Sequence, residues 1–464
     1  MQLVGTVVMA RLLTPAEVGT FAVAAVFAAM AGAMRNFGTS EFLIQEAKLD
    51  DSVVRAANGV VLVVSWSLGL LLNLLAQPIG AFYGASDVAT LIRVLSISFF
   101  LTPFAAVTLA TFRRELQMRP AFITNFTSNL LGLATGIGLA LQGFGAASLA
   151  WSTVAGAVTA VLLALLFKPR SLPLAPSLVG ARRIFAFGKH VTGVYAFGQV
   201  GAGAPDAIIG KAAGVTAVAY FSRANGLIEL FNRLVLYAIW PVVMPVFARS
   251  AREPGGVQAT YLAGTGYLTA IAWPILFLMG LLAFPAIRVF YGDQWVASVP
   301  PAQILCIAAA LGVSYHLTKD TLLAIGQARQ CNLLQFKVHA LRICGIALVV
   351  PFGMNGASWG IVAGTAVGLV LTHRSLHAAT GLVLADVLAA LLPSLRIAVL
   401  SVLPAWALAA AFPPDAGNYL AVGLGGSALT VAAWCWLLRR EKHPLWAEVT
   451  AIARRLAPAT RSER

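Results

Sequence analysis

The chain reads LLAQPIGAFYG at residues 74–84 and LLAFPAIRVFYG at residues 281–292. Each stretch is an apolar run followed by Ala-x-Pro and by a short spacer that ends in Phe-Tyr-Gly. The two spacers differ in length by one residue. Because transporters are often built from repeats that survive as weak internal sequence symmetry, the repetition predicts a duplicated unit.

The composition places this duplicated unit in a membrane. Hydrophobic residues make up 59% of the 464 residues, charged residues make up 11%, and the mean hydropathy is +0.84. A soluble domain carries about 25% charged residues. Apolar runs of about 20 residues, each long enough to cross a bilayer as a helix, recur along the chain. Because these runs are continuous rather than alternating, we predict an all-α polytopic membrane protein.

Fourteen apolar runs are predicted as membrane spans. The first, residues 1–13, is too short to cross a bilayer, and we expect the native start to lie upstream of Met1. No cleavable signal peptide is evident, because the N-terminus lacks a basic region and a small-residue cleavage site. The other predicted spans are 18–36, 56–78, 88–110, 121–142, 145–167, 187–210, 217–248, 264–287, 301–325, 331–352, 356–379, 391–412 and 418–438.

The duplication has a period of six helices. The first Phe-Tyr-Gly ends the third predicted helix and the second ends the ninth. The stretch ARLLTPAEVGTFAVA from residue 10 also resembles GKAAGVTAVAYFSRA from residue 210, which joins helices one and two to helices seven and eight. We therefore predict two six-helix lobes related by a pseudo-two-fold axis along the membrane normal, with two helices appended. The predicted parts are an N-terminal lobe at 1–170, a cytoplasmic amphipathic linker at 171–186, a C-terminal lobe at 187–380, two additional helices at 381–440 and a basic cytoplasmic tail at 441–464.

Positive charge lies mainly on one side of this predicted topology. The net charge is +15, and 22 of the 32 lysines and arginines lie in the tail and in loops that follow even-numbered helices. The loops on the other side hold Arg11, Lys211 and Arg288. Cytoplasmic loops of membrane proteins are rich in lysine and arginine, so both termini are predicted to be cytoplasmic. The same distribution explains the charge without a nucleic-acid partner.

The chain lacks the motifs of several enzyme classes. It has no G-x-x-x-x-G-K-[ST] loop for ATP, no His-Glu-x-x-His, and no Cys-x-x-Cys among its four cysteines. No predicted outer loop is long enough to hold a catalytic site. We therefore expect no enzyme activity, no cofactor and no metal site. The driving force of transport would come from an ion gradient, the membrane potential or consumption of the transported molecule.

Polar residues form a stripe along the predicted eighth helix. Charges inside a membrane span usually face a bundle interior or an aqueous cavity. Glu229 and Arg233 are four residues apart and can pair within the helix. Arg223 lies off the stripe, nearer the outer end. The stripe residues fall at i, i+3, i+7, i+10 and i+11: Ser222, Asn225, Glu229, Asn232 and Arg233.

Other predicted helices also carry polar groups inside the membrane. Together, their cations predict a water-filled cavity that binds an anionic head group. The alternative is that these groups pair with one another and fix the packing of the helices. They are Asp206 in the seventh helix, His316, Lys319 and Asp320 on one face of the tenth, and Gln335, His339 and Arg342 on one face of the eleventh.

Four stretches carry a resemblance to a known family: ARLLTPAEVGTFAVA at 10–24, RNFGTSEFLIQE at 35–46, PDAIIGKAAGVTAVAYFSRA at 205–224 and FYGDQW at 290–295. They are similar to the bacterial polysaccharide flippases, a branch of the multidrug/oligosaccharidyl-lipid/polysaccharide transporter superfamily. The likeness extends from the N-terminus to about residue 380.

The resemblance implies a flippase for polyprenyl-pyrophosphate-linked oligosaccharide repeat units, which are precursors of exopolysaccharide or of the O-antigen of lipopolysaccharide. Such a protein moves its substrate across the bacterial cytoplasmic (inner) membrane by alternating access. It works among membrane lipids, with polysaccharide polymerase and export proteins as candidate partners. The resemblance also implies cavity cations on the early helices of each lobe, at Arg11, Lys211, Arg223 and Arg233.

Two alternatives remain open. The first is a multidrug or organic-cation antiporter of the same superfamily, whose cavity should be acidic or aromatic rather than cationic. The second is a membrane-embedded glycan polymerase or ligase, against which the internal repeat and the short outer loops argue.

Overall fold

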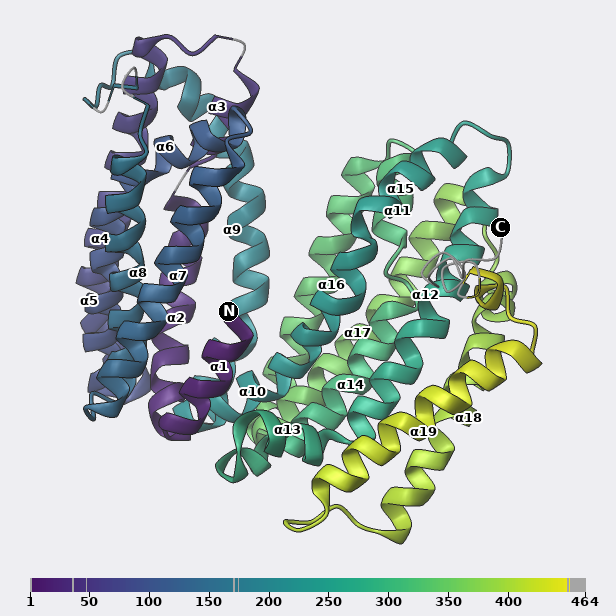
Figure 1. Ribbon diagram of the computed structural model, residues 1–464. Helices are drawn as coiled ribbons and strands as arrows, with labels where there is room; N and C mark the ends of the chain where they lie inside the picture. The colour runs from purple at the N-terminus through teal and green to yellow at the C-terminus, as the bar shows by residue number, and fades with distance from the viewer. Residues whose placement is uncertain are drawn as a thin grey trace, which may run out of the picture. The chain divides into compact units, whose positions relative to one another are not determined.

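The computed structural model describes residues 2–35, 37–46, 48–169, 172–173, 175–448 and 450 (Figure 1). The described residues form helices and connecting turns and contain no strand. The chain divides within α10 (Val215–Phe231) into two compact units, Met1–Ser222 and Arg223–Arg464.

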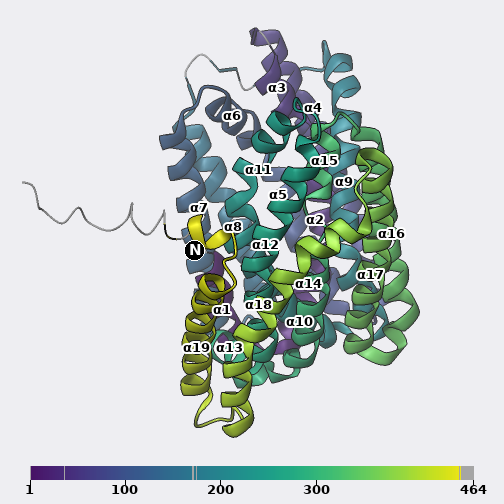
Figure 2. The same cartoon turned by 90° about the vertical axis from the view of Figure 1, so that its right-hand side faces the viewer.

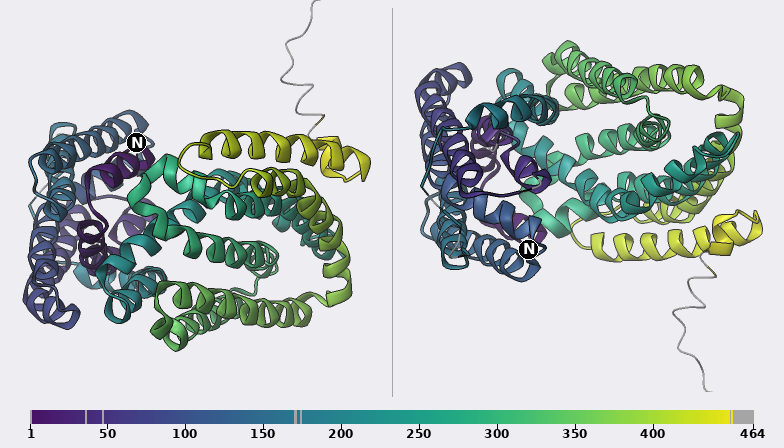
Figure 3. Two further views of the ribbon diagram at one scale, coloured as in Figure 1. Left: turned by 90° about the horizontal axis from the view of Figure 1, so that it is seen from below. Right: turned by 90° about the horizontal axis from the view of Figure 1, so that it is seen from above.

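Unit 1 (Met1–Ser222) is a bundle around α2. This helix packs against α4, α5 and α9, while α7 and α8 pack along each other at the side of the bundle (Figures 1 and 3). The helices of unit 1 before α10 are α1 (Gln2–Leu12), α2 (Pro15–Arg35), α3 (Thr39–Gln45), α4 (Asp51–Tyr83), α5 (Ser86–Leu101), α6 (Pro103–Arg114), α7 (Met118–Leu141), α8 (Ala146–Leu166) and α9 (Ala181–Ala212).

Unit 2 (Arg223–Arg464) contains two long helix pairs. Helices α16 and α17 lie side by side, and α18 and α19 form a second pair, of which α18 packs on α12 (Figure 2). Its described elements after α10 are η1 (Asn232–Leu236), α11 (Tyr237–Ser250), α12 (Gly256–Leu281), α13 (Ala283–Tyr291), η2 (Asp293–Ser298), α14 (Val299–Val313), α15 (Thr318–Ala324), α16 (Ala328–Val349), η3 (Val350–Phe352), α17 (Gly353–Thr380), α18 (Leu384–Ala411) and α19 (Tyr419–Arg440).

The predicted class of all-α membrane protein is confirmed, whereas the predicted count of fourteen spans is not. Each of the fourteen predicted ranges contains helix. Among the residues that the structure describes, nine helical stretches are long and apolar enough to cross a membrane, or ten if the bent pair α5–α6 is one span. One of the nine, Ala328–Thr380, contains both α16 and α17. Helix α1, with 11 residues, is too short for this test.

Three predicted helices are interrupted. The axis bends by 55° between α5 and α6, where Pro103 begins the second helix. The predicted helix 301–325 breaks at residues 314–317, between α14 and α15. The predicted helix 217–248 contains η1, a turn of π-helix. The break at 314–317 and the π-helical turn lie beside polar residues that were predicted on continuous helical faces.

The glycine of each Phe-Tyr-Gly repeat ends a helix. Gly84 follows α4 with φ of +66°, and Gly292 follows α13 with φ of +98°. Side chains other than glycine adopt such left-handed angles only with strain. The repeated sequence is therefore a repeated helix stop, which sets where the preceding tyrosine and phenylalanine lie.

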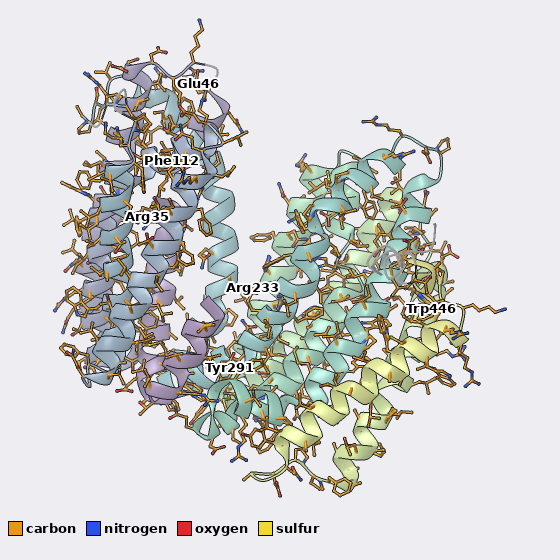
Figure 4. The ribbon with its side chains drawn as sticks, viewed as in Figure 1. Arg35, Glu46, Phe112, Arg233, Tyr291 and Trp446 are labelled. Atoms are coloured by element: carbon orange, nitrogen blue, oxygen red, sulfur yellow. The ribbon has the colours of Figure 1, made fainter. Side chains whose placement is uncertain are left out.

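The described part of the predicted linker packs against the N-terminal turns of α4. The Asn58 side chain donates a hydrogen bond to the carbonyl of Pro173 at 2.9 Å, and the Ser177 amide donates to the carbonyl of Arg55 at 2.9 Å. Arg183, in the first turn of α9, forms an ion pair with Glu46 at 2.9 Å, at the end of unit 1 where Figure 4 labels Glu46. The linker is thus attached to unit 1 by main-chain and side-chain contacts.

The predicted tail begins with a packed segment. Leu445 is buried with Leu437 and Leu438 of α19, and the Trp446 side chain packs against this cluster. Burial lowers the pKa of His443, which lies in the turn between α19 and this segment. Val449 and residues 451–464, where the amphipathic tail was predicted, lie outside the described residues.

Candidate substrate-binding site

The predicted polar stripe lies on the surface of unit 2. Arg233 Nε donates a hydrogen bond to Glu229 Oε1 at 3.2 Å, and the Asn232 side chain lies 3.4 Å from Glu229 Oε2. The side chains of Arg233 and Glu229 are 51% and 39% exposed, and Asn225 is also exposed. Figure 4 shows Arg233 at the edge of the unit. The stripe is therefore a hydrogen-bonded group that a ligand can still reach.

The C-terminal end of this stripe lies in a turn of π-helix. Asn232 and Arg233 begin η1, and Pro241 and Pro245 follow in α11. Proline has no amide hydrogen, so Pro241 cannot donate to the carbonyl of Tyr237. Isolated π-helical turns inside α-helices are frequent at functional sites. The irregular backbone thus coincides with the charged part of the stripe.

Two aromatic residues that the sequence reasoning missed continue the stripe. Tyr237 and Trp240 follow Arg233 by four and seven residues. This helical spacing could have been recognised in the sequence. Lys319 Nζ lies 4.9 Å from the centre of the Trp240 ring, within the range of a cation–π contact. This contact joins α15 to the stripe.

Lys319 and Asp320 lie at the start of α15. Asp320 is buried, and its carboxylate accepts a hydrogen bond from its own backbone amide. His316 lies in the turn before α15, within electrostatic range of Lys319. The three residues are thus neighbours, although the predicted continuous helical face is wrong because the helix breaks at 314–317.

Arg342 and His339 lie on α16, beside α17. Tyr315 is within electrostatic range of Arg342, which is half-buried. In the part of the chain that the structure describes, Arg342 has no ion pair. A Cβ at Gly364 of α17 would lie 2.7 Å from the Arg342 Cα, so the glycine lets α16 approach closely. Among the described residues, Arg342 is thus a cation of unit 2 that, unlike Arg233, has no carboxylate partner.

Two of the predicted cavity cations contact the aromatic residues of the repeat. In unit 1, Lys211 Nζ lies 4.3 Å from the ring centre of Phe82 and donates to its carbonyl at 2.6 Å. In unit 2, the Arg223 guanidinium lies 5.4 Å from the ring of Tyr291 and 5.0 Å from the ring of Trp295. Each copy of Phe-Tyr-Gly therefore holds one cation of the neighbouring helix.

The remaining candidates of unit 1 are less informative. Asp206 follows Pro205 within α9 and is half-buried, and Arg11 is exposed in the last turn of α1. Arg35, near the end of the predicted span 18–36, is the last residue of α2 and lies 5.6 Å from the ring of Phe99. Figure 4 shows it among the helices of unit 1.

Replacing Arg223 with alanine is expected to destabilise unit 2. The guanidinium packs between Tyr291 and the fully buried Trp295, and a desolvated cation–π contact contributes about 2 kcal/mol. Thermal unfolding of the purified protein in detergent should show a lower Tm. Arg396→Ala is the control, because this arginine is exposed in a 3.7 Å pair with Glu441. A Tm equal to that of the control would contradict the contact.

Comparisons with known proteins agree with this architecture. Residues 8–300 match the family model described as polysaccharide biosynthesis protein. The succinoglycan biosynthesis transport protein ExoT of Rhizobium meliloti (strain 1021) is 24% identical over 313 residues, which is 66% of this chain and 62% of the relative. The teichuronic acid biosynthesis protein TuaB of Bacillus subtilis (strain 168) is 22% identical over 56% of this chain and 54% of the relative. The chain thus matches less than two thirds of the length of these relatives.

Two solved structures share the fold. The inward closed conformation of the lipid II flippase MurJ matches with a TM-score of 0.73 and 13% identity, over 95% of this chain and 97% of that protein. An inward-facing multidrug resistance transporter of the MATE family matches with a TM-score of 0.60 and 18% identity, over 82% of this chain and 94% of that protein. Because the family model covers more than half of the sequence, the chain belongs to the polysaccharide biosynthesis protein family, and its fold is that of multi-pass transporters.

Proposed function

We propose that the protein flips polyprenyl-pyrophosphate-linked oligosaccharide repeat units across the bacterial cytoplasmic membrane. The observation that carries this proposal is the half-exposed Arg233 in a π-helical turn of a membrane helix, with Lys319 nearby through Trp240. Arginine binds phosphate oxygens through two parallel hydrogen bonds, and lysine adds a point charge. The family to which the chain belongs includes a relative named as a succinoglycan transport protein. We therefore take the neutral part of the substrate to be a glycan.

The Glu229–Arg233 pair gives this site a mechanism for binding and release. Without substrate, the arginine is neutralised by Glu229, which lowers the cost of a charge inside the membrane. A pyrophosphate that enters the cavity competes with Glu229 for the guanidinium. When the cavity opens on the other side, Glu229 can recover its partner and favour release of the lipid-linked glycan. The polyprenyl tail would remain in the bilayer throughout this exchange.

The charge balance argues against the drug-antiporter alternative. The candidate site residues of unit 2 that lie within predicted spans include the cations Arg233, Lys319 and Arg342 and the acids Glu229 and Asp320. Of these two acids, Asp320 is buried. A cavity for organic cations should have the opposite balance. A polymerase or ligase is not favoured by any observation. A polysaccharide polymerase is instead a candidate partner, because it would consume the flipped glycan on the outer side.

Native mass spectrometry of the protein extracted gently from its own membrane tests the proposal. A bound polyprenyl-pyrophosphate glycan is the expected result, and its mass would also identify the sugars. If only phospholipid is bound, even after arrest of glycan polymerisation raises the substrate level, the proposal loses its support. An efflux assay with organic cations would then test the antiporter alternative.

Cysteine labelling is expected to place the linker in the cytoplasm and the repeat turn outside. Val179 is 82% exposed, and Ser86, beside the first Phe-Tyr-Gly, is also exposed. In a background where the exposed Cys344 is replaced with serine, an impermeant maleimide added to intact cells should label Ser86→Cys but not Val179→Cys. Both should react after the cells are opened. Labelling of Val179→Cys in intact cells would reverse the proposed topology.

A further inference from the structure

The charged part of the polar stripe is continuous with an aromatic surface. Tyr237 is 57% exposed and Trp240 is 42% exposed, and they follow Arg233 by four and seven residues, after the π-helical turn η1. The neighbouring residues Phe231 and Leu236 are buried in the core of unit 2. The aromatic rings are therefore not part of the packing core.

This face is more consistent with an aqueous cavity than with lipid. A charged side chain in the middle of a span costs several kcal/mol when it faces hydrocarbon, so such residues turn to water or to protein. Arg233 and Glu229 are partly exposed, and they precede Tyr237 by four and eight residues. The aromatic rings beside these charges are then exposed to the same water. They therefore differ from the tryptophans that face lipid at the two membrane interfaces.

Trp240 is held in place by a cation. Lys319 Nζ lies 4.9 Å from the ring centre and covers part of the indole, while 42% of the residue stays exposed. The Lys319–Trp240 contact orients the ring and places a positive charge over one of its faces, which leaves the other face for a ligand. Along the helix axis, Arg233 and Trp240 are about 10 Å apart, given seven residues at the usual rise. A ligand that spans both must combine an anion with a neighbouring group that packs on an aromatic surface.

We propose that Trp240, with Tyr237 beside it, is a sugar-stacking platform that takes a pyranose ring of the lipid-linked glycan next to the pyrophosphate. This inference rests on the proposed function and specifies where the glycan binds. One face of a pyranose presents C–H groups that pack on an aromatic ring, and its hydroxyls can bond to the polar stripe at Asn225 and Asn232. A stacking surface tolerates different sugars, so it would bind the class of substrate without selecting one sugar sequence.

Two probes separate the sugar platform from the pyrophosphate site. The full chain in nanodiscs is titrated with undecaprenyl pyrophosphate and with undecaprenyl-pyrophosphate-linked galactose, whose ring has a broad C–H face. The unmodified chain should bind the galactose probe more tightly. Trp240→Ala removes the contact with Lys319 as well as the ring, so it should weaken binding of the galactose probe about tenfold more than binding of the bare carrier. Trp240→Phe should retain most of the sugar-dependent affinity.

A matched control and three outcomes make the test decisive. Trp359 of α17 is 51% exposed, so Trp359→Ala removes an exposed tryptophan of the same unit and should change neither affinity. If Trp240→Ala weakens both probes equally, Trp240 only supports the fold and the inference is wrong. If galactose adds no affinity to the unmodified chain, the platform is wrong but the pyrophosphate site stands. If neither probe binds, the proposed function fails and the platform fails with it.

Discussion

Replacing Arg233 with glutamine is expected to abolish glycan export while the amount of protein in the membrane stays normal. Two effects add. The variant loses the charge-assisted hydrogen bonds to pyrophosphate, which contribute about 1.5–3 kcal/mol, or roughly 10–150-fold in affinity. It also removes the charged partner of Glu229, whose carboxylate then repels the anionic substrate at the proposed site. The side chain is 51% exposed, so folding should not depend on it.

The double variant Arg233→Gln/Glu229→Gln separates these two effects. Removal of the unpaired carboxylate should restore part of the export, above the level of Arg233→Gln and below that of the unmodified chain. Glu229→Gln alone should bind undecaprenyl pyrophosphate more tightly, because the competing carboxylate is gone, and should release it more slowly. Export is measured as surface polysaccharide per cell in a strain that lacks the chromosomal copy. Normal export by Arg233→Gln at equal expression would exclude this residue from the site.

The helical class and the approximate position of most helices were predictable because they follow from apolar runs that are local in the sequence. Lipid-compatible stretches of about 20 residues specify helices whatever their neighbours are. The interruptions were harder to predict. Pro103 indicates the bend between α5 and α6, but no residue type predicts the π-helical turn at Asn232 or the break after Val313. These depend on how the helices pack.

The candidate site was only partly predictable for the same reason. The spacing of Glu229 and Arg233 predicts their ion pair, because residues four apart are neighbours on a helix. The contact between Lys319 and Trp240 joins two elements that are far apart in the chain, so periodicity within one helix does not reveal it. Likewise, Arg223 was expected from the family resemblance, and its aromatic partners, Tyr291 in the second copy of the repeat and Trp295 just after it, are far from it in the chain.

One strong signal in the sequence was missed. Gly356, Gly360, Gly364 and Gly368 recur every four residues along α17. Small residues at this spacing form a flat stripe that lets two membrane helices approach closely. In the structure a Cβ at Gly360 would lie 2.4 Å from the carbonyl oxygen of Gly345 in α16, and a Cβ at Gly364 would lie 2.7 Å from the Arg342 Cα. The stripe therefore sets the position of Arg342 as well as the packing of α16.

Gly360→Ala is accordingly expected to reduce stability strongly, and Gly360→Leu is expected to prevent accumulation of folded protein. The contact at Gly360 is with backbone, which cannot rotate away, so the helices must separate. Overpacking of this kind costs about 1–3 kcal/mol for small insertions and more for large ones. Size-exclusion chromatography of detergent-solubilised protein after heating measures the loss.

Four glycines of unit 2 differ in how closely a Cβ would approach its neighbours, so their alanine variants should differ in the size and direction of the change in stability. Nothing lies within 4 Å of a Cβ built at Gly312 of α14, so Gly312→Ala should be neutral or stabilising, because alanine favours a helix by about 1 kcal/mol over glycine. At Gly368 the nearest atom is a Val338 side-chain carbon at 3.3 Å, which can shift, so Gly368→Ala should cost little. Gly364→Ala and Gly360→Ala should cost progressively more, as their nearest contacts shorten to backbone atoms at 2.7 and 2.4 Å. If all four variants melt alike, the close approach of α16 and α17 is wrong, and the placement of Arg342 that depends on it is wrong as well.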